Sequence, residues 1–134
     1  MRERRNEGHL LTLIAEEVPD ILVGAGTILT PAQTDQAVAA GAQFLVGPGM
    51  TPALLQHLLS LNLPVLPGVA TVGEIMAVLE NGLNAMKFFP AGLSYLAAIG
   101  APIPHAQFCP TGGVSLVGLS AGIPCVAERR LCRR

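Results

Sequence analysis

Residues 64–90 read PVLPGVATVGEIMAVLENGLNAMKFFP and contain one complete structural repeat. Short apolar runs occupy both ends, 64–69 and 85–90. Between them, Thr71 stands three residues before Glu74, a capping-box spacing that begins a helix, and Gly82 stands where such a helix would end. The pattern therefore predicts strand, helix and strand in succession. Strands joined by a helix of this length are expected to pair in parallel through a right-handed crossover.

The same repeat continues in both directions along the chain. Thr30–Pro31 and Thr51–Pro52 have the spacing of helix starts, and Gly41 has the position of a helix end. Five apolar runs, each ending in a loop of Gly, Pro or Thr, lie about 20 to 23 residues apart: Ile21–Thr27, Phe44–Gly49, Pro64–Val69, Ala85–Pro90 and Ala106–Gly113. Apolar runs without strict alternation are typical of strands covered on both faces, so the predicted class is α/β with parallel strands.

An open doubly wound sheet and a closed barrel are both compatible with this period. A doubly wound sheet has one glycine-rich turn at its ligand site, whereas here a loop of small residues follows every predicted strand. This pattern favours the barrel. We therefore predict a (β/α)8 TIM-barrel type, incomplete, with about five of its eight strands present. Leucines and other apolar residues at helical spacing over 10–18 predict a helix before the first strand. Residues 1–134 are interpreted as a single partial barrel domain, with 116–134 as an irregular C-terminal tail.

Composition excludes several classes of function. Hydrophobic residues make up 51% of the chain and charged residues 13%, which is enough apolar material for a folded core. No uninterrupted apolar stretch reaches the roughly 20 residues of a membrane helix, so no membrane partner is expected. Residues 6–127 carry seven acidic side chains and one lysine, a balance that disfavours nucleic-acid binding. The cysteines are Cys109, Cys125 and Cys132, and they form no C-x-x-C pair. Together with the lack of a signal-peptide pattern, this predicts a cytoplasmic location.

Lys87 is the strongest candidate for a catalytic residue, because it is the only lysine in the sequence and lies in an apolar run beside Phe88 and Phe89. Apolar surroundings favour the uncharged amine, which can attack a carbonyl to form a Schiff base. A surface lysine at a strand end is the alternative.

Two glycine loops are candidate ligand contacts. Thr27 ends the sequence Gly-Ala-Gly-Thr, where it could face a ligand or only cap a turn. Thr111-Gly112-Gly113 follows the last run, and such a loop can bind an anion through its backbone N–H groups. Neither a dinucleotide fingerprint nor a Walker loop is present. The histidines are scattered, so no metal site is predicted.

Taken together, these motifs resemble one known family. They are Gly24-Ala25-Gly26-Thr27, Gly47-Pro48-Gly49, Leu66-Pro67-Gly68 with Thr71, Lys87-Phe88-Phe89-Pro90-Ala91 and Phe108-Cys109-Pro110-Thr111-Gly112-Gly113. In this order and spacing they are similar to the 2-keto-3-deoxy-6-phosphogluconate aldolase and 4-hydroxy-2-oxoglutarate aldolase family. The recognisable aldolase region is 10–115.

The resemblance implies a trimeric (β/α)8 barrel that works as a class I aldolase without a metal or organic cofactor. It implies that Lys87 forms the Schiff base with a 2-keto acid, that Thr27 contacts the pyruvyl carboxylate and that Phe89 packs beside the site. Thr111, Gly112 and Gly113 would line the far end of the substrate. Pro48 is kept as a further candidate substrate contact, although a Gly-Pro-Gly sequence first of all shapes a loop.

The implied reaction is cleavage of 2-keto-3-deoxy-6-phosphogluconate to pyruvate and glyceraldehyde 3-phosphate, the reaction of the Entner-Doudoroff pathway. Cleavage of 4-hydroxy-2-oxoglutarate to pyruvate and glyoxylate is the other possibility. The family's general acid/base glutamate and carboxylate-binding arginine belong to a Glu-x-x-x-Arg strand that this sequence does not contain, so neither role is assigned and impaired activity is expected. The alternatives are a noncatalytic remnant and a phosphate-binding barrel isomerase or synthase in which Lys87 acts only as a charge.

Overall fold

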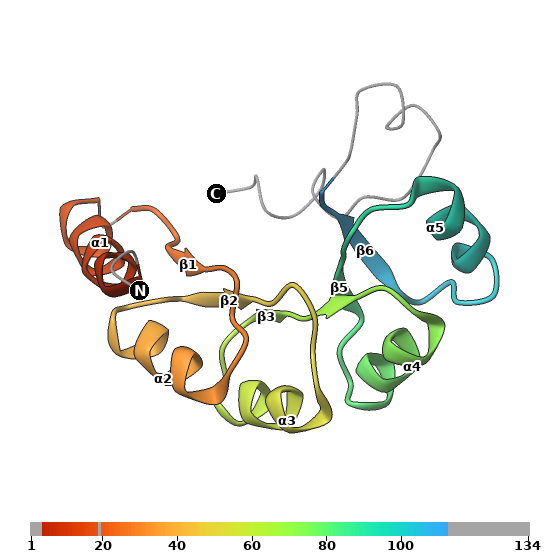
Figure 1. Cartoon of the computed structure of the whole chain (residues 1–134), viewed down its shortest axis with the longest axis horizontal. Coiled ribbons are helices and arrows are strands. Elements are labelled where there is room, and N and C mark those ends of the chain that lie inside the picture. Colours follow the sequence, from red (N-terminus) through yellow and green to blue (C-terminus); the bar gives the residue numbers. More distant parts are fainter. Residues whose placement is uncertain (1–3, 19, 113–134) are drawn as a thin grey trace. The chain divides into compact units, whose positions relative to one another are not determined.

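The structure is a computed structural model that describes residues 4–18 and 20–112 (Figure 1). The chain divides into two compact units, residues 1–66 and 67–134. The tail predicted over 116–134 lies outside the described residues, and the assignment of the chain to a single domain stays a prediction. Among the described helices, none has the length and apolar character needed to cross a bilayer.

The first unit contains three helices and a three-stranded parallel sheet. Its helices are α1 (Arg4–Glu17), α2 (Pro31–Ala39) and α3 (Pro52–Ser60), and its strands are β1 (Gly24–Ala25), β2 (Phe44–Val46) and β3 (Val65–Leu66). The strands pair in sequence order, β1 with β2 and β2 with β3. Helices α2 and α3 lie on the same side of this sheet (Figure 1). The helix expected over 10–18 is confirmed as the greater part of α1.

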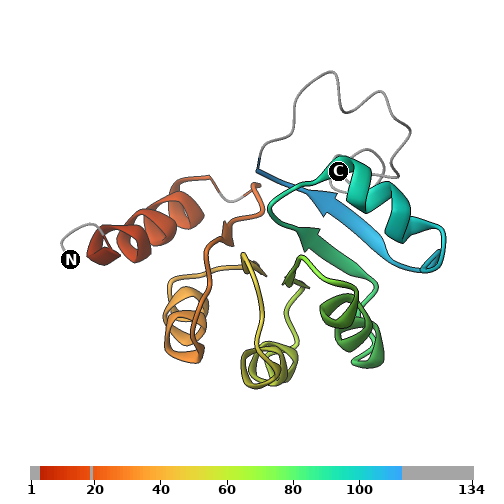
Figure 2. The ribbon, with the colours of Figure 1, turned by 45° about the vertical axis from the view of Figure 1, so that its right-hand side comes forward.

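The second unit repeats this arrangement. Its strands are β4 (Gly68–Val69), β5 (Ala85–Phe88) and β6 (Gln107–Pro110), and its helices are α4 (Val72–Glu80) and α5 (Leu93–Gly100). Strand β5 is central and pairs in parallel with β4 and β6. Figure 2 shows α4 and α5 beside this sheet. The predicted α/β class with parallel strands is confirmed, and within each unit the strands pair in sequence order.

Helix starts and ends follow the predicted signals closely. The side chains of Thr30, Thr51 and Thr71 each accept a hydrogen bond from the backbone N–H three residues later. Pro31 and Pro52 then occupy the first helical turn, where a missing N–H costs nothing. Beyond the helix ends, Gly41 and Gly82 have φ of +96° and +81°, a left-handed conformation that glycine adopts without a steric penalty.

The observed strands are shorter than the apolar runs that predicted them. Within the run Ile21–Thr27 only Gly24 and Ala25 are paired, and Leu22 is 69% exposed. The run 64–69 is divided at Pro67 between β3 and β4. Proline has no N–H and cannot donate a ladder hydrogen bond, although its carbonyl accepts one from the N–H of Lys87 at 2.9 Å.

The core of the first unit lies between the sheet and the helices α2 and α3. Ala25 and Leu45 from the strands pack with apolar residues of both helices: Ala37, Leu54 and Leu58. Thr34 is fully buried in α2, and its hydroxyl donates to the carbonyl of Thr30 at 3.1 Å. At the surface, Nε2 of His57 in α3 and Oδ1 of Asp35 in α2 form a hydrogen bond of 2.8 Å that joins the two helices.

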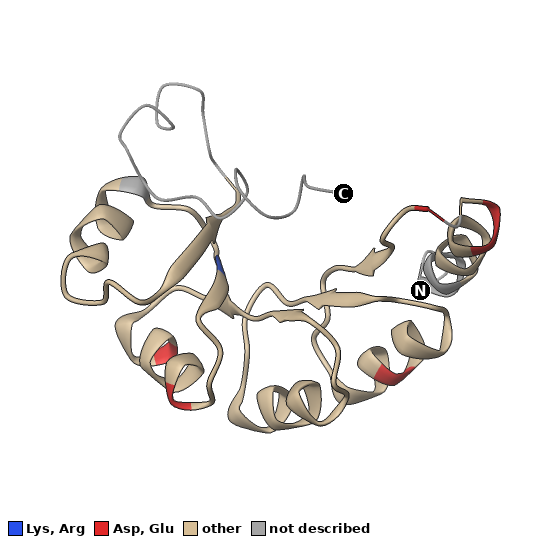
Figure 3. Ribbon diagram, turned by 180° about the vertical axis from the view of Figure 1, so that it is seen from behind, with Lys and Arg blue, Asp and Glu red and all other residues tan. Residues whose placement is uncertain are grey.

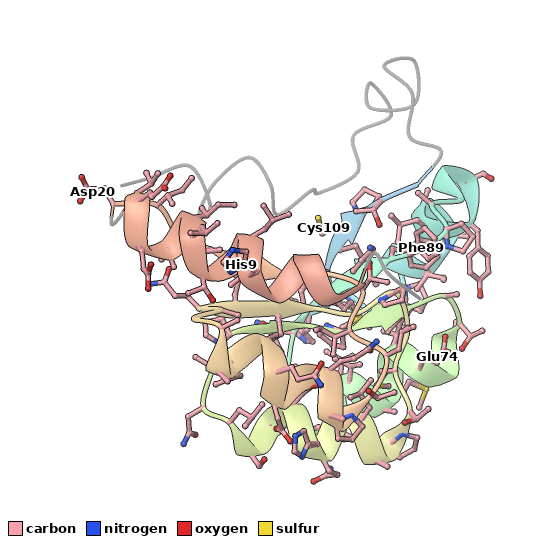
Figure 4. The ribbon with its side chains drawn as sticks, turned by 60° about the vertical axis from the view of Figure 1, so that its left-hand side comes forward. His9, Asp20, Glu74, Phe89 and Cys109 are labelled. Atoms are coloured by element: carbon pink, nitrogen blue, oxygen red, sulfur yellow. The ribbon has the colours of Figure 1, made fainter. Side chains whose placement is uncertain are left out.

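The start of α4 should make stability depend on pH. The carboxylate of Glu74, which lies in α4 (Figure 4), accepts hydrogen bonds from the N–H groups of Ala70 and Thr71, both at 2.9 Å, and from the Thr71 hydroxyl. The Ala70 N–H above all holds the pKa of Glu74 below its ordinary value, with the two Thr71 donors adding to the effect against an opposing effect of burial. A lowered pKa in the folded state stabilises the fold above the ordinary pKa, and this contribution is lost as the pH falls through the folded value.

We expect Glu74→Gln to lower the free energy of unfolding at pH 7 by about 0.3 to 1 kcal/mol, because the amide keeps an acceptor oxygen but loses the negative charge at the helix start. It should also reduce the fall in stability that the unaltered chain shows below about pH 4.5. Urea unfolding at several pH values measures both effects. Glu80→Gln, at the other end of α4, is the matched control. An unchanged pH dependence in Glu74→Gln would contradict this account of the cap.

Candidate active site

Strand β5 separates the core of the second unit from a candidate site. Successive side chains of a strand point to opposite faces of its sheet. Met86 and Phe88 are buried, and the Phe88 ring contacts the rings of Tyr95 in α5 and Phe108 in β6, with centroids 6.0 and 5.9 Å away. Lys87 therefore points to the opposite face, away from α5, and its side chain is half-buried. Figure 3 shows it as a basic position in β5, with the acidic positions on helices or in the loop after α1.

The lysine amine lies over an aromatic ring. The Nζ atom of Lys87 is 5.0 Å from the centroid of the Phe89 ring. The sequence predicted apolar neighbours that would favour the neutral amine. Phe89 presents the face of its ring, where the π electrons attract a positive charge. The contact therefore has the geometry of a cation–π interaction.

Thr111 contributes a buried hydroxyl on the same face. It directly follows β6, and its N–H extends the ladder by donating to the carbonyl of Phe88 at 3.0 Å. The register pairs Lys87 with Cys109, and Thr111 is two residues further, so the alternation places all three on one face of the sheet. The buried Oγ1 atom of Thr111 has no hydrogen-bond partner among the residues that the structure describes. Buried polar groups are normally paired, so this hydroxyl is suited to a ligand.

Hydrogen bonds link the segment that follows β5 to the segment that follows β6. The N–H of Ala91 donates to the carbonyls of Thr111 and Gly112, at 3.0 and 3.1 Å. Gly112 has a φ of +75°, and a Cβ placed on it would lie 2.8 Å from the Phe89 ring. The structure thus brings together Lys87, Phe89, Thr111 and Gly112, which the sequence singled out. Gly113 lies outside the described residues.

Two predicted residues belong to the first unit. Thr27 is exposed and has a φ of +58°, a left-handed conformation that is a genuine outlier for a β-branched residue. Strained residues of this kind concentrate at functional sites. Pro48 is half-buried in the loop after β2. A Cβ added to the preceding residue, Gly47, would approach the carbonyl oxygens of Gly49 and Ile28. The roles of Thr27 and Pro48 in binding stay predictions.

The sequence did not reveal Cys109 as part of this face. Cys109 is half-buried in β6 (Figure 4), and it pairs with Lys87 in the register. The alternation with Phe108 and Pro110 was the available signal, because a buried Phe108 places its neighbour on the other face. Within residues 4–18 and 20–112, no three His, Cys, Asp or Glu side chains gather as metal ligands would.

Comparison with known proteins gives consistent results. Residues 5–121 match the model of the KDPG and KHG aldolase family. A 2-dehydro-3-deoxy-phosphogluconate aldolase from Dickeya dadantii is 47% identical over 110 residues, which are 79% of this chain and 52% of that protein. A KHG/KDPG aldolase from Escherichia coli is 46% identical over 106 residues, 76% of this chain and 50% of that protein. The chain spans about half the length of these curated relatives.

A solved structure has the same fold. A KDPG aldolase from Legionella pneumophila, crystallised with pyruvate captured at low pH as a covalent carbinolamine intermediate, superposes with a TM-score of 0.80. The two sequences are 43% identical, and the match covers 84% of this chain and 57% of the other. The parallel α/β architecture of the described residues is therefore that of these aldolases.

The left-handed conformation of Thr27 should cost stability. Because glycine adopts this conformation without penalty, we expect Thr27→Gly to raise the free energy of unfolding by about 1 kcal/mol. Thr27→Ala keeps the Cβ atom and so the strain, and it should change stability much less. Urea unfolding of the three proteins tests this. A Thr27→Gly variant that is less stable than the unaltered chain would contradict the assignment of strain.

Proposed function

The chain belongs to the KDPG and KHG aldolase family, and on this premise we propose that it uses Lys87 as a Schiff-base nucleophile toward a small 2-keto acid. The observation that carries the proposal is the placement of Lys87. Its amine is on the face of β5 turned away from the core, over the Phe89 ring. A carbinolamine with pyruvate, as in the Legionella relative, requires an amine that is accessible in this way.

The first chemical step would be addition to the ketone. The uncharged amine of Lys87 attacks C2 of the 2-keto acid, a C–N bond forms, and the carbonyl oxygen takes up a proton. Loss of water from this carbinolamine leaves an iminium cation on Nζ. The Phe89 ring, 5.0 Å from Nζ, would stabilise that cation through its π face.

The iminium would then act as an electron sink. The hydroxyl on C4 loses its proton as the C3–C4 bond breaks, the bonding electrons pass to the iminium nitrogen, and an aldehyde leaves. Protonation of the enamine at C3 and addition of water release pyruvate and return the free lysine. We assign the proton transfers at the C4 hydroxyl and at C3 to no residue, because the family's Glu-x-x-x-Arg pattern has no match in the sequence.

Binding of the substrate is proposed for the residues near Lys87. The buried hydroxyl of Thr111 can donate to or accept from a polar group of the substrate, and Gly112 and Gly113 would form the adjoining wall. Thr27 and Pro48 are proposed as further contacts, Thr27 toward the pyruvyl carboxylate. The substrate would be 2-keto-3-deoxy-6-phosphogluconate or 4-hydroxy-2-oxoglutarate, following the names of the relatives.

We also propose that the repeating strand–helix units correspond to part of a (β/α)8 barrel, with helices outside and Lys87 inside. The fold shared with the Legionella aldolase supports this proposal. The homotrimer and independence from cofactors remain predictions from the family, and the cytoplasmic location remains a prediction from the cysteine pattern. Sedimentation analysis of the purified chain measures the first of these.

Reductive trapping tests the proposed nucleophile. We expect incubation with pyruvate and sodium borohydride to attach the pyruvyl carbons to Lys87, since an imine is reduced to a stable secondary amine. Peptide mapping by mass spectrometry separates this adduct from any at the N-terminal amine. Lys87→Arg keeps the charge but cannot form the imine, so it should remain unmodified. Without an adduct at Lys87 in the unaltered chain, the barrel isomerase or synthase and the noncatalytic remnant become the better explanations.

Turnover by the 134-residue chain should be slow even where trapping succeeds. Loss of a positioned general acid/base typically costs about 10²- to 10⁴-fold in rate. We therefore expect pyruvate release from the phosphogluconate substrate well below the roughly 10 per second of an ordinary enzyme. Coupled assay of pyruvate measures it. An ordinary rate would show that another residue of this chain moves the proton.

A further inference from the structure

We propose that Gly112 is a positioning residue for Lys87: because it carries no side chain, it leaves the space in which the Phe89 ring lies against the lysine amine. The proposal adds a role to the Schiff-base function argued above and rests on it for its catalytic meaning. Its structural part, a link from Gly112 through Phe89 to Lys87, can be tested without substrate.

Gly112 and the Phe89 ring are in close approach. A Cβ atom added to Gly112 would lie 2.8 Å from Cε2 and 3.0 Å from Cδ2 of that ring. Both distances are shorter than ordinary contacts between carbon atoms, at about 3.5 to 4.0 Å. A side chain at position 112 therefore requires the ring to move.

The backbone on both sides leaves the ring few ways to move. The N–H of Ala91 donates to Thr111 and Gly112, and the N–H of Phe89 donates to Val69 at 3.1 Å. A backbone shift would break these hydrogen bonds. Rotation of the side chain is less costly, because Phe89 is 38% exposed and can turn toward solvent. We therefore expect a side chain at position 112 to turn the ring away from Nζ of Lys87.

Loss of this contact has a defined consequence for the cation. An exposed cation–π contact changes an equilibrium by about two- to fivefold. Formation of the iminium from the uncharged amine places a positive charge on Nζ, so the ring should favour the iminium over the uncharged amine by that factor. Gly112 would act on this equilibrium only through Phe89.

The experiment compares Gly112→Ala, Phe89→Ala and the double variant. Gly82→Ala is the matched control, because Gly82 also has a positive φ, +81°, but no described residue has an atom within 4 Å of where its Cβ would lie. Since Lys87 is the only lysine in the sequence, protein labelled with ¹³C-lysine gives one side-chain ε-methylene signal in NMR spectra. Borohydride trapping over a range of pyruvate concentrations gives the imine equilibrium for the same four variants.

We expect the Phe89 ring current to shift the ε-methylene signal of Lys87 in the unaltered chain. Gly112→Ala and Phe89→Ala should both remove most of that shift and weaken imine formation about two- to fivefold. The double variant should be no worse than Phe89→Ala alone. Gly82→Ala should leave the Lys87 signal and the imine equilibrium unchanged.

Several results would overturn the proposal. One is a Lys87 signal that does not change in Gly112→Ala, another is an equal change in Gly82→Ala, and a third is losses that add in the double variant. If Gly112→Ala does not fold, adding Phe89→Ala should restore folding by removing the clash. If the double variant does not fold either, backbone strain at position 112, and not the clash with the ring, is the cause. Absence of trapping in the unaltered chain would count against the proposed function, while the NMR comparison still decides the link between Gly112 and Lys87.

Discussion

The two-residue alternation of side chains along β5 determines how the second unit is organised. Because Met86 and Phe88 are needed on the buried face, Lys87 must lie on the other face. Parallel pairing with β6 then brings Cys109 beside the lysine and Thr111 onto the same side. A shift of one residue in this register would bury the amine and expose Phe88, so the core and the candidate site depend on the same constraint.

Much of this organisation could be predicted from the sequence because its signals are local. Thr30, Thr51 and Thr71 mark the starts of their helices through hydrogen bonds that reach only three residues along the chain. Gly41 and Gly82 mark helix ends for an equally local reason, their positive φ. Lys87 stood out because a charged residue inside an apolar run needs an explanation. The class of fold followed from the repetition of these signals at a nearly constant interval.

Features that depend on residues distant in sequence could not be predicted in the same way. The contact of Gly112 with Phe89 arises only when β5 and β6 pair, because the two residues are far apart along the chain. The same holds for the hydrogen bond between His57 and Asp35 and for the buried hydroxyl of Thr111. The sequence indicated that Phe89 is near Lys87, but it could not show that the ring presents its face to Nζ. Residue types identified the site, and pairing of the strands supplied its geometry.

The threonine caps have a consequence for how such a chain can be divided and recombined. Each threonine caps its helix through the N–H three residues later, so a segment that begins at Thr30, Thr51 or Thr71 takes this hydrogen bond with it intact. A junction placed just before one of these threonines keeps the capping hydroxyl and the N–H that donates to it in the same segment. Chimaeras built from related sequences should therefore tolerate crossovers there better than crossovers inside the first helical turn, where donor and acceptor would come from different parents.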